Sequence, residues 1–390
     1  MPAPFLPPEL VAAILDFPVL RPADLARCCR ASSTFADIAR PRLYKEVVLR
    51  LLPPAVVHEQ ADPDLSMQMD DRTEDVLDVL SRSSHLEPLI RGVALTFGAA
   101  VDLQRENGAC STRWTTVRAL LKRLADELPA VNAIWLPNAQ LDATCAALME
   151  EERLQHLTSL ALGGVHEEAW KLLNRLGGLK ELAVDGPVVP VGADLGPPSF
   201  RLFSLVVKGG VAGSPDALAA LTVLIESSQN TLRRLDLAIS PTQFPHLSLF
   251  PSLTHLTLSF RDRLTANDLS ETLPSVVAAC PSLTHFTLAP KLSLSPDFFH
   301  ELCLPDGLGA HLPPSLTRLS ILDRSAAVVD FVNILDDLSA ETNLREIGYF
   351  PSHRVWRSAN RGAAQREVPE EYDWLRDRCW ERGVRLVELD

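Results

Sequence analysis

The chain has 390 residues, of which 46% are hydrophobic, and a formal net charge of −13. This length exceeds the roughly 100–200 residues of a single core, so it favours two domains or one elongated repeat array. The acidic balance excludes the broadly basic surface that neutralises phosphates, so we expect neither nucleic acid nor a membrane surface as a partner.

The cysteines and the N-terminal residues indicate a compartment. Seven cysteines, an odd number without a C-x-x-C pair, favour reduced thiols. The first residues lack the basic segment and apolar run of a secretory signal, and no apolar stretch reaches the ~18 residues that a spanning helix needs. We therefore expect a cytoplasmic or nuclear protein.

The first fifty or so residues predict three short helices. Pro7 and Pro8 suit a helix start, and Leu10, Ile14 and Leu15 then share one face. Further prolines end this helix, and a second and a third helix carry apolar residues of their own. Such a small module cannot bury all this apolar surface by itself, so part of the surface needs a partner.

This segment resembles the F-box in five spaced motifs, which are Leu6-Pro7-Pro8-Glu9-Leu10, Ile14-Leu15, Asp24-Leu25, Ser32 to Phe35, and Arg40-Pro41-Arg42-Leu43-Tyr44. In that family the module docks on a Skp-type adaptor, which bridges to a cullin and so recruits a ubiquitin-conjugating enzyme. The resemblance implies that the adaptor contacts include Leu6, Pro7, Pro8, Leu10, Ile14, Leu15 and Leu25. The alternative is a terminal cap over the core of the next domain.

Beyond an acidic stretch, one pattern recurs from about residue 86 onward: apolar-x-x-apolar-x-apolar. Its clear copies begin at Leu157, Leu179, Leu202, Leu232, Leu253, Leu283, Leu316 and Leu344, with weaker copies at Ile90 and Val131 and a last possible one at Val384. The clear copies start 21 to 33 residues apart, near the roughly 20–29 of leucine-rich repeats but uneven. Each copy predicts a short strand, and the segments between copies carry helical periodicity.

The repeats resemble the leucine-rich-repeat family, most clearly in Pro-Ser-Leu-Thr-His-Leu-Thr-Leu from Pro251 and Pro-Ser-Leu-Thr-His-Phe-Thr-Leu from Pro281. The asparagine that usually follows the strand is mostly missing, so we expect irregular turns. A doubly wound domain is the alternative fold, but it gives no reason for so many copies of one motif.

The expected fold class is α/β: an N-terminal three-helix F-box, then an irregular leucine-rich-repeat solenoid with parallel strands on its concave face and helices on its convex face. The expected domains are an F-box at 1–50, an acidic linker and the first helix of the array at 51–85, repeats at 86–350, and a C-terminal cap at 351–390. The cap begins with a helix after Pro369. Its tryptophans suit burial over the open end or, alternatively, peptide binding.

Motifs for catalysis are missing from the sequence. It contains no nucleophile elbow and no glycine-rich phosphate loop, and in His166-Glu167-Glu168-Ala169-Trp170 a tryptophan stands where a zinc helix needs its second histidine. We therefore expect no enzymatic activity, no cofactor and no metal.

The strand residues that point away from the core predict a binding face for a protein substrate. Its candidate residues are Trp135, Arg234, Asp236, His255, His285 and Arg318. Arginine suits phosphate geometry, so our hypothesis is that the basic members of this set receive an acidic or phosphorylated segment. The alternative is a solvated strand face with incidental charges.

Taken with the resemblance, the sequence predicts a substrate-recognition subunit of a Skp-cullin-F-box ubiquitin ligase. A repeat scaffold that works independently of ubiquitin is the first alternative, and a hydrolase with an unrecognised site is the second.

Overall fold

The computed structural model covers the whole chain and divides it into two compact units, residues 1–163 with 167–179 and residues 164–166 with 180–390. The residues that the structure describes are 8–15, 22–52, 68–69, 71–83, 85–97, 117–136, 141–189, 198–208, 215–239, 250–260, 276–277, 279–290, 308–322, 328–339, 341–349 and 370–389. No helix within these ranges is long and apolar enough to cross a membrane.

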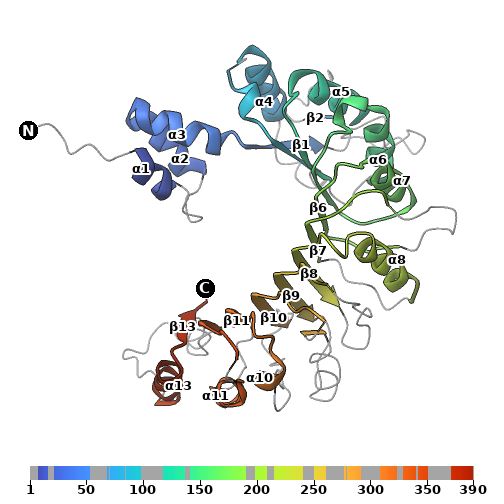
Figure 1. The fold of residues 1–390 in the computed structure, drawn as a ribbon. Coiled ribbons are helices and arrows are strands. Elements are labelled where there is room, and N and C mark those ends of the chain that lie inside the picture. The colour runs from blue at the N-terminus through green and yellow to red at the C-terminus, as the bar shows by residue number, and fades with distance from the viewer. Residues whose placement is uncertain are drawn as a thin grey trace, which may run out of the picture. The chain divides into compact units, whose positions relative to one another are not determined.

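The chain begins with a three-helix module (Figure 1), formed by α1 (Pro8–Leu15), α2 (Pro22–Ala31) and α3 (Ser33–Leu43). Ser32 caps α3, since its hydroxyl accepts a hydrogen bond from the backbone N–H of Phe35 at 3.3 Å. Arg42 donates to the carbonyls of Ile38 and Ala12, at 2.8 and 3.4 Å, and so links α3 to α1. A small core of its own holds the module together, made of Val11, Leu15, Leu25 and Ala39.

The first unit continues as strands alternating with helices. Its sheet has the order β2-β1-β3-β4-β5, in which only β1 and β2 pair in antiparallel fashion. The strands are β1 (Glu46–Leu52), β2 (Gln68–Met69), β3 (Gly92–Phe97), β4 (Ala133–Leu136) and β5 (Ser159–Leu162). The helices are α4 (Asp71–Arg82), α5 (Val117–Glu127), α6 (Leu141–Glu150) and α7 (Glu167–Arg175), with 3₁₀ turns η1 (Glu87–Leu89) and η3 (Glu152–Leu154).

The second unit is a parallel sheet whose strands follow in chain order from β6 to β13. The strands are β6 (Glu181–Val184), β7 (Ser204–Val207), β8 (Arg234–Ile239), β9 (His255–Phe260), β10 (His285–Pro290), β11 (Arg318–Ile321), β12 (Glu346–Tyr349) and β13 (Arg385–Glu388). The helices are α8 (Pro215–Glu226), α10 (Leu308–His311), α11 (Val328–Asp337) and α13 (Glu370–Glu381). Figure 1 shows these helices on one side of the strands.

The repeated apolar triplet accounts for the core of both units. In each clear copy the first two apolar positions are buried, and neighbouring copies align side by side: Leu256 faces Phe286, and Phe286 faces Leu319. Strand residues alternate between this core and the open face, as β9 shows most regularly. The predicted α/β repeat architecture behind a three-helix module is therefore confirmed, and the last possible copy forms strand β13.

Two features of the first unit add to the expected organisation. Strand β1 runs across residue 50, the expected end of the helical module, and pairs with β3 from Glu46 to Leu51. Its buried Val47 and Leu49 belong to the sheet. Strand β2 then lies inside the stretch expected to be an acidic linker. The repeat sheet thus begins within the residues that the sequence assigns to the module.

Hydroxyl side chains connect successive repeats just before four of the strands. A threonine there donates to a backbone carbonyl of the preceding repeat. The pairs are Thr158 with Asn132 at 3.4 Å, Thr254 with Arg233 at 3.0 Å, Thr284 with Thr254 at 2.9 Å, and Thr317 with Thr284 at 3.0 Å.

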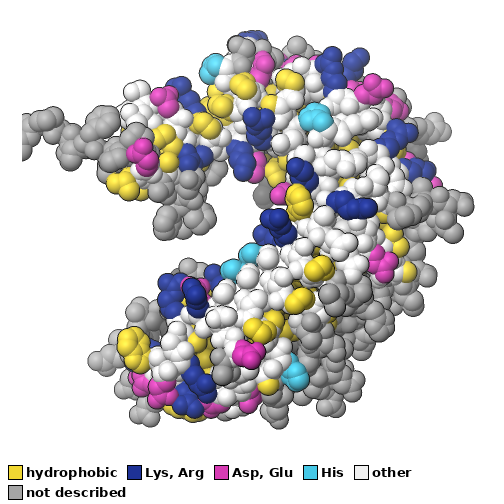
Figure 2. Space-filling view, viewed as in Figure 1, with side chains coloured by type: hydrophobic (Ala, Val, Ile, Leu, Met, Phe, Trp, Pro, Cys, Tyr) yellow, Lys and Arg dark blue, Asp and Glu magenta, His cyan; other side chains and the backbone are white. Residues whose placement is uncertain are grey.

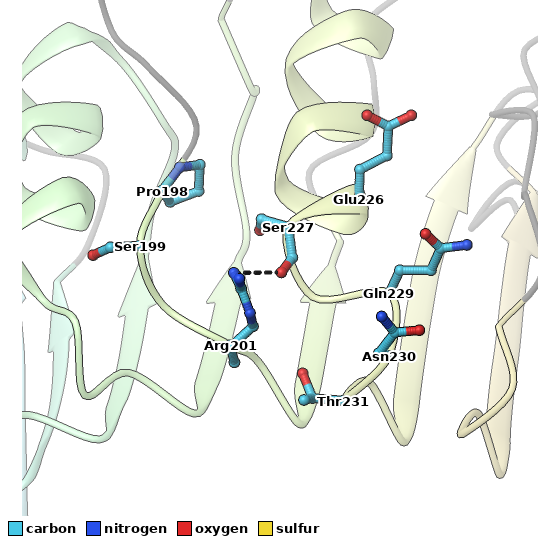
Figure 3. A pocket seen from close by; sticks show the side chains of 8 residues that line it. All are labelled: Pro198, Ser199, Arg201, Glu226, Ser227, Gln229, Asn230 and Thr231. Atoms are coloured by element: carbon cyan, nitrogen blue, oxygen red, sulfur yellow. Dashed lines mark hydrogen bonds between the residues drawn. The ribbon is translucent and has the colours of Figure 1, made fainter.

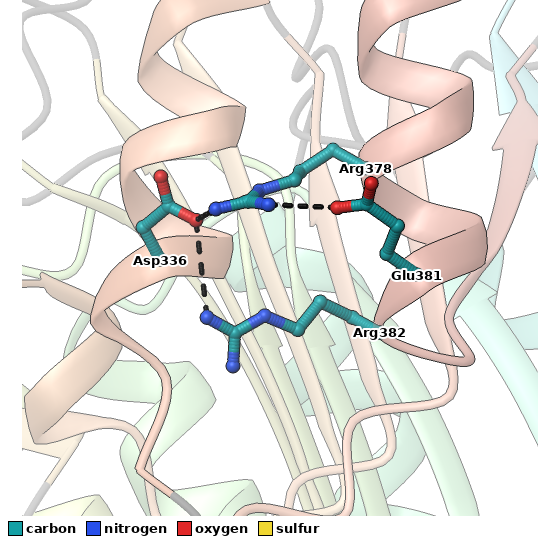
Figure 4. Close-up of polar contacts among 4 residues, drawn as sticks. All are labelled: Asp336, Arg378, Glu381 and Arg382. Atoms are coloured by element: carbon teal, nitrogen blue, oxygen red, sulfur yellow. Dashed lines mark hydrogen bonds and ion pairs between the residues drawn. The ribbon is translucent and has the colours of Figure 1, made fainter.

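The C-terminal helix α13 packs against α11 and contributes buried Leu375 and Cys379 to the end of the second unit. Asp336 of α11 accepts from Arg378 Nε at 2.9 Å and lies 3.8 Å from Arg382 (Figure 4). The expected helix after Pro369 is present, and both apolar burial and exposed ion pairs join it to its neighbour.

Candidate functional site

The first candidate surface is the outer side of α1. Leu10 and Ile14 lie one turn apart, and 52% and 50% of their surfaces are exposed, respectively. Leu15 and Leu25 instead belong to the module's core, where they are 4% and 9% exposed. Of the other expected adaptor contacts, Leu6 and Pro7 lie outside the described residues, as does the side chain of Pro8.

The second candidate surface is a polar row on the open face of the second unit. The strand register aligns residues from eight successive strands, each about 4.8 Å from the next. The row consists of Glu181, Ser204, Arg234, His255, His285, Arg318, Glu346 and Arg385. Four of the residues predicted for a substrate face, from Arg234 to Arg318, are therefore consecutive members of it.

The two histidines at the centre of the row form a stacked pair. Their ring centroids are 4.2 Å apart and their planes differ by 11°. Each Nδ1 lies 2.9 Å from the hydroxyl of the preceding threonine, Thr254 or Thr284. Each hydroxyl also lies within hydrogen-bond distance of a backbone carbonyl, and when it donates its single proton there, the ring donates to it from Nδ1. In that arrangement the nitrogen that titrates is Nε2.

The environment of the pair disfavours the charged imidazolium. Partial burial lowers the pKa of His255, and the neighbouring His285 and Arg234 lower it further. The pKa of His285 is also lowered, by partial burial and by Arg318, while Glu346 opposes the shift. Both rings are thus predominantly neutral near pH 7, beside two permanent cations.

Two acidic residues lie close to the arginines of the row. Asp236 lies two residues along β8 from Arg234, in the next row of the face, and burial raises the pKa of its carboxyl although Arg234 and Lys208 oppose the shift. Glu346 lies 3.8 Å from Arg318 and also pairs with Arg385. The pairing of Glu346 with Arg385 was not predicted, because the last strand was only a possible copy of the repeat.

Trp135, the sixth predicted substrate residue, lies in the other unit. It belongs to β4, where its indole covers Gly92 so closely that a Cβ at that glycine would lie 2.9 Å from the ring. Val48, Ala94, Trp135 and Ala161 form an in-register apolar row on that sheet. Trp135 therefore belongs to the apolar row of the first unit, and the polar row belongs to the second unit.

Histidine and basic side chains lie together on the surface of the second unit. Figure 2 shows histidine side chains next to Lys and Arg side chains on one face of the second unit. His255 and Arg234 are exposed, whereas His285 and Arg318 are half-buried. The face is therefore accessible to a charged partner.

A separate pocket of about 540 Å³ lies between the start of β7 and the end of α8. Figure 3 shows Arg201 donating to the carbonyl of Ser227, at 2.9 Å, across this pocket. The remaining lining residues are Pro198, Ser199, Glu226, Gln229, Asn230 and Thr231. None of the predicted substrate residues lines it. Within the described residues, no group of three or more His, Cys, Asp or Glu side chains could hold a metal ion.

Together these features define the class of protein: an α/β repeat protein with a small helical module at its N-terminus. The module can be assigned more closely, because residues 3–50 match the family model described as F-box-like. The chain therefore carries an F-box-like segment at its N-terminus, followed by the α/β repeats of the sheet.

Two further comparisons, with solved structures and with curated proteins, do not assign the chain more closely. A crystal structure of a complex of Rad7 and Elc1 from yeast is similar to this chain, with 17% identity and a TM-score of 0.35. The match covers 72% of this chain and 83% of that one. A search of curated proteins found no match.

Proposed function

We propose that this protein is the substrate-recognition subunit of a Skp-cullin-F-box ubiquitin ligase in the cytoplasm or nucleus. The F-box-like module binds a Skp-type adaptor, which links it to a cullin, and the open strand face of the repeats binds a target protein. The protein catalyses no reaction itself but raises the effective concentration of the target near the ligase. Of the predicted substrate residues, Arg234, Asp236, His255, His285 and Arg318 form the proposed target face, with Trp135 as a separate contact.

The exposed apolar pair on α1 carries this proposal. The module is too small to bury Leu10 and Ile14, and it presents them on a helix within the segment that matches the F-box-like model. Leu15 and Leu25 then act indirectly, by holding α1 in place from within the core.

Co-purification with a Skp-type adaptor tests the proposal. The double variant Leu10→Ala/Ile14→Ala should weaken adaptor binding more than about tenfold, because each truncation removes apolar area worth about 1 kcal/mol or more at an interface. The matched control is Val76→Ala/Val79→Ala, which truncates two exposed apolar side chains on α4. Failure of the unaltered chain to retain the adaptor would instead favour a ubiquitin-independent scaffold.

A further inference from the structure

We propose that Arg234, His255, His285 and Arg318 form a proton-dependent binding site for a phosphomonoester carried by the target protein. This inference deepens the proposed function, since it rests on the target binding at the open face of the repeats. It names the chemistry of the ligand and assigns the histidine pair a part in holding it.

The geometry provides converging donors. Each ring is held through Nδ1 by its threonine, and the two rings are stacked nearly parallel, so the two Nε2 atoms lie side by side. The guanidinium-bearing residues Arg234 and Arg318 occupy the flanking positions of the same row. Protonated Nε2 atoms would therefore add two donors between two arginines.

The floor beside the pair is small and neutral. In the next row of the face, His255 and His285 are followed by Thr257 and Thr287, and in the row after that by Ser259 and Ala289. Of the acidic residues that act on the site, Asp236 of β8 lies beside Thr257, at the Arg234 end of this floor, and Glu346 lies beyond Arg318, where it also pairs with Arg385. An anion over the centre of the row thus meets hydroxyl groups and cations first.

A phosphomonoester fits this site better than a carboxylate. It carries close to two charges near neutral pH and three acceptor oxygens, whereas a carboxylate carries one charge and two oxygens. Two imidazolium donors and two arginine forks can satisfy the larger set, and the guanidinium plane suits phosphate geometry.

Binding is linked to protonation of the histidines. In the free protein the two rings resist protonation, since partial burial lowers the pKa of both and each lies next to an arginine, although Glu346 opposes the shift at His285. A bound dianion reverses this balance, so binding takes up protons and strengthens as the pH falls below about 7. Near pH 6 the phosphate begins to lose its own second charge, so further acidification stops helping.

The test uses the full chain, labelled with ¹³C at the histidine Cε1 position and titrated with N-acetyl-O-phosphoserine methylamide. The variants His255→Gln and His285→Gln assign the two resonances. We expect both to shift saturably, with an affinity roughly tenfold higher at pH 6 than at pH 7.5. The absence of saturable shifts at these two histidines would overturn the proposal.

Variants separate the roles of the groups. In His255→Gln/His285→Gln each amide N–H replaces the Nε2 donor but does not titrate, so binding should remain and should no longer strengthen as the pH falls from 7.5 to 6. Binding that still strengthens over this range would contradict the proton linkage. Arg234→Gln/Arg318→Gln should weaken binding at every pH. Arg91→Gln/Arg376→Gln removes the same charge from exposed positions outside the row and should leave the affinity unchanged. An equal loss of affinity in the two arginine double variants would reveal only a general charge effect.

Two further arms distinguish the outcomes. N-acetylglutamate methylamide should bind much more weakly than the phosphoserine compound, and equal affinities would replace the phosphomonoester assignment with a general acidic-peptide site. Adaptor co-purification is measured on the same variants. If phosphate binding fails while the adaptor is retained, only this inference is wrong. If the unaltered protein binds phosphate but does not retain the adaptor, the proposed function is wrong and the phosphate site remains supported.

Discussion

At the scale of single residues, the most constrained charge is Arg123 on α5. Its side chain is only 6% exposed and donates to Glu127 Oε1 at 2.6 Å and to Asp78 Oδ1 of α4 at 2.9 Å. These hydrogen bonds outweigh burial and raise the pKa of the guanidinium. Arg123 therefore stays charged and connects two helices of the first unit.

Replacing this arginine tests its contribution to stability. We expect Arg123→Met to lower the free energy of unfolding by about 2 kcal/mol, less than the ~3–5 kcal/mol of a fully buried pair, because both carboxylates keep part of their exposure. Denaturant unfolding measures the change. Arg153→Met, whose partner Asp126 is 2.7 Å away but exposed, serves as the control and should cost at most ~1 kcal/mol.

Thiol chemistry gives a second residue-scale prediction. Burial raises the pKa of Cys280 to about 12 and that of Cys379 to about 11, so both stay protonated and unreactive at pH 8 in the folded protein. Cys28 and Cys29 are only half-buried. Site-resolved mass spectrometry after alkylation should find Cys28 and Cys29 modified before Cys280 and Cys379, and Cys280 modified only after denaturation. Equal rates at Cys28 and Cys280 would contradict this burial.

The candidate row shows how far residue-level prediction reaches. The alignment of Arg234, His255, His285 and Arg318 follows from a period of two along each strand and from one motif repeated in register. The stacking of the rings and their tautomer depend on side-chain rotamers, which periodicity does not specify. The copies at Pro251 and Pro281 nevertheless share Thr-His, a signal of a common local arrangement.

At the scale of elements, Gly309 of α10 lies at a close contact between two helices of the second unit. A Cβ at this glycine would lie 2.3 Å from the backbone carbonyl oxygen of Ile334 in α11. Backbone of a helix cannot move aside as a side-chain end can, so the glycine sets the distance between α10 and α11.

Adding one methyl group therefore tests this contact. Gly309→Ala should destabilise the protein by about 2 kcal/mol or more, because the two helices must separate. The same substitution at Gly178, where the nearest atom to the new Cβ would be 3.9 Å away, is the control. Comparable thermal unfolding of both variants would show that α10 is held less firmly than its packing implies.

Elements were predicted well where the triplet is regular and less well at the start of the array. Residues Pro215 to Ser227 carry helical periodicity and form α8, as the sequence indicates. Strand β1 was not expected, because Val47 and Leu49 directly follow the last helix of the module and were assigned to it. Only pairing with β3, which is distant in sequence, identifies them as a strand.

At the scale of the molecule, each strand in a repeat array contacts only its neighbours, so the ends of the array need protection. Strand β13 and helix α13 supply it at the C-terminal end: β13 pairs with β12, while α13 packs on α11. The sequence predicted a cap from the helix start after Pro369 and a last possible copy of the repeat at Val384, and in the structure that copy forms the final strand.

Removing this last repeat tests whether burial or ion pairs hold the end of the array. Deletion of residues 370–390 exposes the edge of β12 and the surface of α11 that Leu375 and Cys379 cover. We therefore expect the melting temperature to fall by more than about 5 °C and aggregation to increase. Arg378→Gln/Arg382→Gln removes only exposed ion pairs, those of both arginines with Asp336 and that of Arg378 with Glu381, and should leave the melting temperature nearly unchanged. Differential scanning calorimetry with light scattering measures both. A shortened chain that melts with the full chain would mean that β12 is a stable end by itself, whereas a large effect of the arginine variant would assign the closure of the array to electrostatics.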